Sequence, residues 1–141
     1  MRLSNPVDLI ILNKENQVLL CKRAENEHGQ KGKWSIPGGG PEPDEGFEDA
    51  IHREIKEELG CEISWLRYFK SYCMRMSDKQ ISRSVYFYGE VDGEIQLNDE
   101  LSDHKWVDLD DPGLLNENLA FNQKEVLRDF IRFLGNGHQS A

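Results

Sequence analysis

The chain has 141 residues, of which 38% are hydrophobic and 9% aromatic, so we expect one soluble globular domain with its own hydrophobic core. Its 26 Asp and Glu residues outnumber its 17 Lys and Arg residues, and the formal net charge is −9. This charge argues against binding of polymeric nucleic acid or of an anionic membrane surface, but not against small phosphorylated ligands, because divalent cations can invert the local charge of a carboxylate cluster.

The cysteines and the N-terminus indicate the compartment. Cys21, Cys61 and Cys73 show no CxxC spacing, and we interpret them as free thiols of a reducing compartment rather than as a disulfide framework or a zinc site. The apolar run near the N-terminus is broken by Asp8 and is too short for a signal peptide. No window is long enough to span a bilayer. We therefore expect a cytoplasmic protein.

In chain order, the first half of the sequence predicts strands followed by one helix. Residues 7–13 and 17–23 are apolar runs on either side of a polar turn, which predicts a hairpin of two paired strands. The segment WSIP is a short strand that ends at Pro37, since proline cannot continue a β-ladder. Residues Phe47–Leu59 are predicted to form a helix, and Gly60 to end it in the left-handed conformation.

The second half predicts three more strands and a closing amphipathic helix. In order, these elements span residues 61–73, 82–91, 104–109 and 122–134. Strands on both sides of a central helix predict an α/β fold in three layers, with a mixed sheet between helices. We expect a single domain over residues 1–135 and a flexible tail over residues 136–141.

The first predicted helix carries carboxylates beside an apolar stripe. The stripe would anchor the helix to the sheet, and it consists of Phe47, Ile51, Ile55 and Leu59. Glu54, Glu57 and Glu58 are spaced i, i+3, i+4, so their side chains converge although like charges repel. A hard cation such as Mg²⁺, which prefers oxygen ligands, would balance this charge. The alternative is a solvated helix face on which Arg53 and Glu57 form an i,i+4 ion pair.

A glycine-rich turn, PGGG, precedes this helix, and glycine lets the backbone approach a ligand closely. The stretch from Gly39 to Cys61 resembles the signature of the Nudix hydrolase family, which runs Gly, five residues, Glu, seven residues, then Arg-Glu-apolar-x-Glu-Glu-x-Gly-apolar. Here the fixed positions are Gly39, Glu45 and the segment REIKEELGC that begins at Arg53. The one departure is Cys61, where a bulkier apolar residue is usual. The resemblance implies a MutT-like, Nudix-type α/β/α sandwich that covers nearly the whole chain.

The resemblance also implies an enzyme that hydrolyses the diphosphate bridge of a nucleoside diphosphate linked to another group. The cofactor would be Mg²⁺, or Mn²⁺ in its place. The metal ligands would be the Gly38 carbonyl oxygen and the carboxylates of Glu54, Glu57 and Glu58. The general base would be Glu54 or Glu100, and the choice between them stays open. Without the resemblance, Glu100 would be an ordinary loop acid.

Further site positions follow from the same resemblance. Arg53 and Glu45 would form an ion pair that, together with Gly39, locks the loop onto the helix and orients the catalytic carboxylates. Arg23 would face the nucleotide, and Asn122 would present its amide to the edge of the base. For Asn122 the sequence alone favours a simpler role as the N-cap of the last helix.

The choice of substrate lies in the loops of such a fold. The family's ADP-ribose hydrolases usually carry a proline a short way beyond the signature, and its dinucleoside polyphosphate hydrolases a tyrosine nearby; the segment SYCMRMSDKQ has no proline, and no tyrosine at the marking position. Arg23 and Asn122 therefore favour a MutT-like enzyme that converts a (deoxy)nucleoside triphosphate to the monophosphate and pyrophosphate. The alternatives are a nucleotide-sugar or ADP-ribose hydrolase and, from another class, a non-catalytic nucleotide-binding Nudix module. The partner is a small-molecule nucleotide in each case, and a homodimer stays open.

Overall fold

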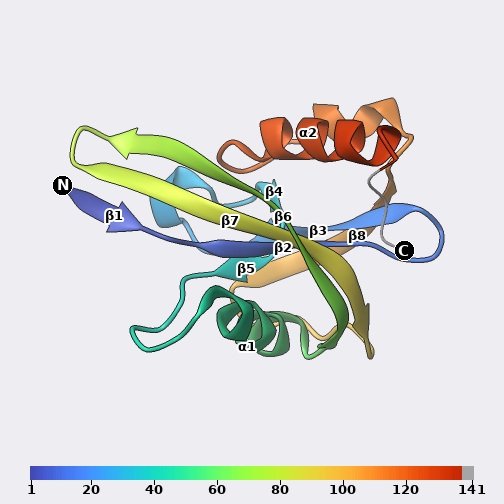
Figure 1. Cartoon of the computed structure of the whole chain (residues 1–141), viewed down its shortest axis with the longest axis horizontal. Helices are drawn as coiled ribbons and strands as arrows, with labels where there is room; N and C mark the ends of the chain where they lie inside the picture. The colour runs from blue at the N-terminus through green and yellow to red at the C-terminus, as the bar shows by residue number, and fades with distance from the viewer. Residues whose placement is uncertain (138–141) are drawn as a thin grey trace.

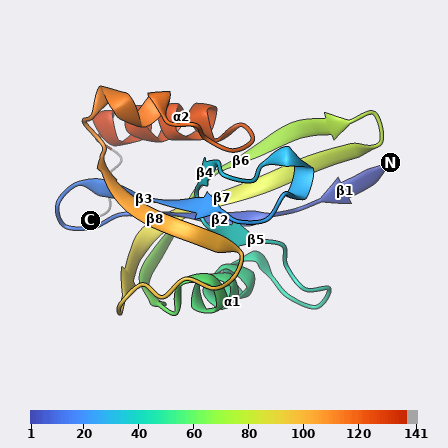
Figure 2. The ribbon, with the colours of Figure 1, turned by 180° about the vertical axis from the view of Figure 1, so that it is seen from behind.

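The computed structural model describes residues 1–137. The strands are β1 (Arg2–Ser4), β2 (Val7–Ile11), β3 (Gln17–Arg23), β4 (Trp34–Ser35), β5 (Gly38–Gly39), β6 (Glu62–Ser77), β7 (Gln80–Asp92) and β8 (Leu101–Asp108). The helices are the 3-10 helices η1 (Glu27–Gly29) and η2 (Pro112–Asn116) and the α-helices α1 (Phe47–Leu59) and α2 (Gln123–Gly135). The two α-helices lie on opposite sides of the strands (Figures 1 and 2), so the predicted three-layer α/β/α arrangement is confirmed.

The strands form two sheets rather than one. The larger sheet has five strands in the order β1-β7-β2-β5, and β6 pairs with β7. Its β1–β7 and β2–β7 pairs are parallel, whereas β2–β5 and β6–β7 are antiparallel, so the predicted mixed sheet is present. The smaller sheet has the order β4-β3-β8 and is antiparallel throughout.

Each central strand is buried on both faces. Successive side chains of a strand point to opposite faces, and in β2 Leu9 belongs to the apolar cluster under α1, whereas Ile10 belongs to the cluster under α2. Helix α1 contributes Ile51 and Ile55 to the first cluster, and α2 contributes Phe130 to the second, all of them fully buried. Burial on both faces explains why these strands read as continuous apolar runs.

The predicted hairpin between residues 7–13 and 17–23 is wrong. The segments are joined at the turn by a single bridge between Leu12 and Val18. From there β2 continues into the larger sheet and β3 into the smaller one. Asn13 holds the turn together, because its side-chain oxygen accepts from the backbone N–H groups of Glu15 and Gln17. Each strand then satisfies its ladder with partners that are distant in the sequence.

Several strand limits also differ from the prediction. The β6–β7 hairpin is longer than expected, since β6 extends to Ser77 and β7 begins at Gln80. Strand β8 begins at Leu101 rather than at residue 104. The strands β1 and β5 have three and two residues, which is too short to produce a periodic signal.

The two helices begin and end near the predicted residues. Helix α1 has the predicted bounds, and Gly60 ends it with a left-handed φ of 68°. Phe47 does not belong to its buried stripe, because the side chain is 40% exposed at the first helical residue. Asn122 occupies the N-cap position of α2, but its side chain makes no capping hydrogen bond. The predicted tail over residues 136–141 begins with Asn136, which is the C-cap residue of α2. Residues 138–141 lie outside the described part of the chain.

Candidate active site

The glycine turn lies against helix α1 so closely that no side chain fits between them. A Cβ atom on Gly39 would lie 2.5 Å from the carboxylate carbon of Glu54. A Cβ atom on Gly38 would lie 2.1 Å from the backbone oxygen of Val7, which is on the neighbouring strand β2. Close packing against backbone therefore requires glycine at position 38, and a side chain at position 39 would displace the Glu54 carboxylate. The turn brings bare backbone next to the carboxylates of α1.

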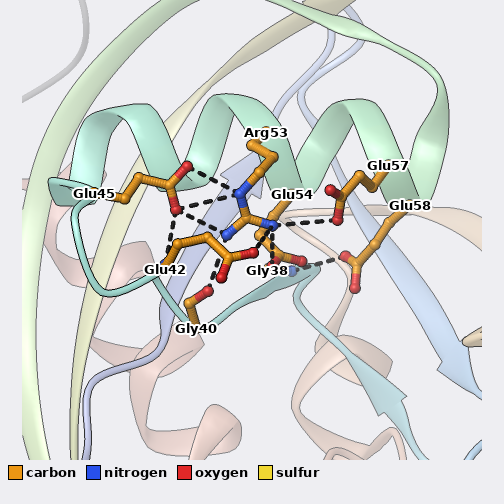
Figure 3. Close-up of polar contacts among 8 residues, drawn as sticks. All are labelled: Gly38, Gly40, Glu42, Glu45, Arg53, Glu54, Glu57 and Glu58. Carbon is orange, nitrogen blue, oxygen red and sulfur yellow. Dashed lines mark hydrogen bonds and ion pairs between the residues drawn. The ribbon is translucent and has the colours of Figure 1, made fainter.

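Arg53 joins the loop to the helix (Figure 3). Its Nε–H and Nη2–H groups donate to the two oxygens of Glu45, both at 2.9 Å, and its Nη2 also donates to the Gly40 carbonyl at 3.0 Å. Its Nη1 donates to Glu54 at 2.9 Å and to Glu57 at 3.2 Å. The Arg53 guanidinium lowers the pKa of Glu45, and the hydrogen bond to Glu45 raises the pKa of Arg53 in return. Arg53 therefore fixes the loop and two of the helix carboxylates together.

Glu58 is the most deeply buried of the three helix carboxylates. It is 5% exposed, and its Oε1 accepts from the Gly38 N–H at 3.1 Å. Burial, the hydrogen bond to Glu100 and the charge of Glu54 together raise the pKa of Glu58 to about 10. Glu58 is therefore buried beside other acids, at a site where negative charge is in excess.

Glu54 and Glu57 differ in their surroundings. The Glu54 side chain is 13% exposed, and burial raises its pKa although Arg53 opposes this. The Glu57 side chain is 55% exposed and lies at the outer edge of the cluster. In residues 1–137, no three Asp, Glu, His or Cys side chains are already arranged as a metal site. The three acids thus lie near the C-terminal end of α1, and the described residues do not form a preformed metal-binding arrangement.

A cavity of about 450 Å³ opens beside this cluster. Glu54, Glu58 and Glu100 line it together with the glycine turn, and so do Arg23 and Asn122. Three of the four predicted metal ligands thus meet the predicted base and nucleotide-binding residues at one cavity. Three of the implied site residues do not line it, namely Glu45, Arg53 and Glu57.

Arg23 is held against the cavity wall by an aromatic ring. Its guanidinium carbon lies 5.3 Å from the ring centroid of Phe121, and the ring of His28 contacts Phe121 edge-on at 6.3 Å. The Nε of Arg23 is buried and has no hydrogen-bond partner among the described residues. A buried donor without a partner is costly, so this group is positioned to bind an acceptor that enters the cavity.

Five buried side chains with polar groups line this cavity without having been predicted from the sequence, namely Asp8, Ser35, Ser84, Tyr86 and Gln123. Burial raises the pKa of Asp8 to about 8, although the charge of Arg23 and a hydrogen bond from Tyr86 oppose this. One signal for Asp8 was present in the sequence. It is a charged residue inside the apolar run VDLII, where a buried strand is expected and an acid is out of place.

A family model matches most of the chain. The model is that of the NUDIX domain, and it matches residues 3–130. The chain belongs to the NUDIX domain family. The Nudix signature found between Gly39 and Cys61 is therefore part of a match that spans the whole fold.

Individual relatives agree with this assignment. The nucleoside triphosphatase NudI of Salmonella typhimurium strain LT2 is 29% identical over 133 residues, which cover 86% of this chain and 94% of that protein. The E. coli ORF135 protein in solution has a TM-score of 0.80 at 26% identity, covering 94% of this chain and 91% of that one. The MutT protein of Methanosarcina mazei Go1 has a TM-score of 0.81 at 26% identity, covering 93% and 94%. The chain is thus a MutT-like Nudix hydrolase, an enzyme that acts on phosphoric anhydride bonds.

Proposed function

We propose that this Nudix hydrolase is a metal-dependent pyrophosphatase that converts a nucleoside triphosphate or deoxynucleoside triphosphate to the monophosphate and pyrophosphate. The observation that carries the proposal is the cavity itself. Glu54, Glu58 and Glu100 line it together with Arg23. Carboxylates bind the cation that accompanies a polyphosphate, and a guanidinium binds the phosphate oxygens.

The donor set fits a hard divalent cation. Every side chain in the cluster offers oxygen, and the excess of negative charge that raises the pKa of Glu58 is what Mg²⁺ or Mn²⁺ would neutralise. We assign Glu54, Glu57, Glu58 and the Gly38 carbonyl as its ligands. When bound, the cation neutralises phosphate charge and lowers the pKa of a coordinated water.

The chain's own residues supply the remaining chemistry. Arg53 keeps Glu54 and Glu57 oriented through its two hydrogen bonds. Glu54 or Glu100 takes the proton from the attacking water, since both carboxylates line the cavity. Arg23 binds phosphate oxygens with its guanidinium, and a planar guanidinium suits this role better than an ammonium group does.

The substrate class rests on two observations. The similar protein from Salmonella is named a nucleoside triphosphatase. The cavity is of a size that takes a small molecule, and Asn122 and Phe121 line it, so an amide and an aromatic ring are available to a base. The free thiols of Cys21, Cys61 and Cys73 support a cytoplasmic location.

The test is a substrate panel. The protein is incubated with Mg²⁺ and nucleoside triphosphates, deoxynucleoside triphosphates, ADP-ribose and sugar nucleotides, and the products are separated by chromatography. We expect monophosphate and pyrophosphate from a triphosphate. Glu57→Gln should lower kcat by about 100-fold or more, whereas Glu48→Gln, an exposed position on the first turn of the same helix, should not. Hydrolysis of ADP-ribose or a sugar nucleotide alone would contradict the substrate, and a flat panel would contradict the function.

A further inference from the structure

Asp8 is a buried carboxylate that the fold does not require. It is 9% exposed in the middle of β2, whose neighbouring residues are all apolar and buried. Its side chain shares a face of the sheet with Ile10, the face that α2 covers, and it lines the cavity. An apolar residue would cost less to bury at this position. A carboxylate that is retained here is therefore expected to act on something in the cavity.

A chain of hydrogen bonds fixes Asp8 in place. The Tyr86 hydroxyl donates to Asp8 and accepts from Gln123 Nε2 at 3.3 Å. Gln123 Oε1 in turn accepts from the Ile36 N–H at 2.9 Å. These residues come from β2, β7, α2 and the segment between β4 and β5, so four parts of the fold hold the carboxylate. A carboxylate has about four acceptor positions, and Tyr86 uses only one of them.

The neighbours of Asp8 indicate which part of a substrate it would meet. A Cβ atom on Gly38 would lie 2.3 Å from Asp8 Oδ1, so Asp8 touches the turn whose N–H donates to Glu58. Arg23 lines the same cavity and is near enough for its charge to act on Asp8, and its guanidinium is the proposed phosphate-binding group. A phosphate oxygen has no proton to donate, so it leaves the acceptor positions of Asp8 unfilled, and the carboxyl group keeps such positions in either protonation state. The next group along a nucleotide is the pentose, which one oxygen and one methylene join to the first phosphorus.

We propose that Asp8 is a specificity-determining residue that accepts a hydrogen bond from a hydroxyl group of the substrate's pentose. The inference rests on the proposed function, because it assumes that the phosphates lie between the carboxylates and Arg23. A site with a buried polar group rejects an analogue that lacks its partner, since the group is then left unpaired. The enzyme should therefore discriminate against nucleotides that lack the hydroxyl that Asp8 binds.

The experiment compares three sugars with one base. We would measure kcat and KM for a ribonucleoside triphosphate and its 2′-deoxy and 3′-deoxy analogues, using the base that the wild-type enzyme prefers. The wild-type kcat/KM should fall about 10-fold or more for one of the two analogues, which identifies the hydroxyl; a loss of this size corresponds to one hydrogen bond. Asp8→Ala should hydrolyse all three within about a factor of 3, and Asp8→Asn, which keeps an acceptor oxygen, should lie between.

Other roles for Asp8 give different results. If Asp8 only stabilises the fold or only binds the cation, Asp8→Ala lowers activity equally for all three sugars, and an unchanged selectivity ratio overturns the proposal. A wild-type enzyme with no sugar preference overturns the proposal without any variant. The proposal can therefore be tested even if the Asp8→Ala protein does not fold. Asp92→Ala, an acid at the exposed end of β7, is the matched control and should leave the ratio unchanged.

Failure of the proposed function is distinguishable from failure of this inference. If the wild-type enzyme hydrolyses no nucleotide, the proposed function fails. The affinities of the ribonucleoside monophosphate and of its 2′-deoxy and 3′-deoxy analogues, measured by calorimetry, then test whether Asp8 binds the pentose. Equal affinities would overturn its role, and a preference that Asp8→Ala removes would support it.

Discussion

Glu58→Gln should stabilise the metal-free protein. The pKa of Glu58 is about 10 in the folded chain against an ordinary value of 4.5, and burial is the main cause. The folded state therefore keeps a proton that the unfolded state releases above pH 4.5, so the free energy of unfolding falls as the pH rises from 4.5 toward 10. At about pH 7.5 the loss is three pH units at about 1.4 kcal/mol each, or about 4 kcal/mol.

Glutamine at position 58 avoids this cost. Its amide oxygen can still accept from the Gly38 N–H, and the neutral amide carries no charge to bury beside Glu54 and Glu100. Because local relaxation and water reduce the effect in the wild-type protein, we expect a gain of about 1 to 4 kcal/mol. For a domain of this size that raises Tm by about 3 °C or more.

The assay is thermal unfolding at about pH 7.5, first with EDTA and then with excess Mg²⁺. Mg²⁺ at about 100 times its Kd should add about 2.7 kcal/mol to the wild-type protein and much less to Glu58→Gln. Glu57→Gln is the matched control, because its side chain on the same helix is 55% exposed and should give no gain in EDTA. If Glu58→Gln is no more stable than Glu57→Gln in EDTA, or gains as much from Mg²⁺ as the wild-type protein, the reasoning is refuted.

Two further predictions concern the glycine turn and the link between β6 and α2. Gly39→Ala should lower Tm and abolish activity, because its Cβ would lie 2.5 Å from the carboxylate carbon of Glu54. The control Gly40→Ala, whose Cβ would have no atom within 4 Å, should change Tm by less than about 2 °C in unfolding scans. Equal effects of the two substitutions would disprove the packing argument. The hydrogen bond from Tyr72 lowers the pKa of Asp129, so the stability that it adds is present above pH 3.8 and is lost as the pH falls through the lowered pKa. Tyr72→Phe should therefore cost about 1 kcal/mol at neutral pH and nothing in strong acid, as measured by urea unfolding; a cost that persists in acid would point to lost packing instead.

Local patterns in the sequence were enough to predict the helix that carries the carboxylates. The four-residue spacing of Ile51, Ile55 and Leu59 and the stop at Gly60 depend only on neighbours along the chain, and the bounds of α1 agree with the prediction. Phe47 follows the same spacing but is the first residue of the helix, and its side chain is 40% exposed. Periodicity does not report where a partner surface ends.

Pairing between distant segments could not be predicted in the same way. The apolar runs at 7–13 and 17–23 suit a hairpin as well as two separate sheets, and only the ladders with β7 and β8, far along the chain, decide between them. The setting of Asp8 has the same origin, because Tyr86 and Gln123 reach it from β7 and α2. Asp8 itself was visible as an acid in an apolar strand, but its partners were not.

The central claim is that the carboxylates of α1 hold a divalent cation beside the cavity, and titration with Mn²⁺ followed by electron paramagnetic resonance tests it most directly. We expect the free Mn²⁺ signal to fall as wild-type protein is added, and both Glu57→Gln and Glu58→Gln to weaken binding by about 10-fold or more. Equal Mn²⁺ binding by the wild-type protein and both variants would contradict the claim.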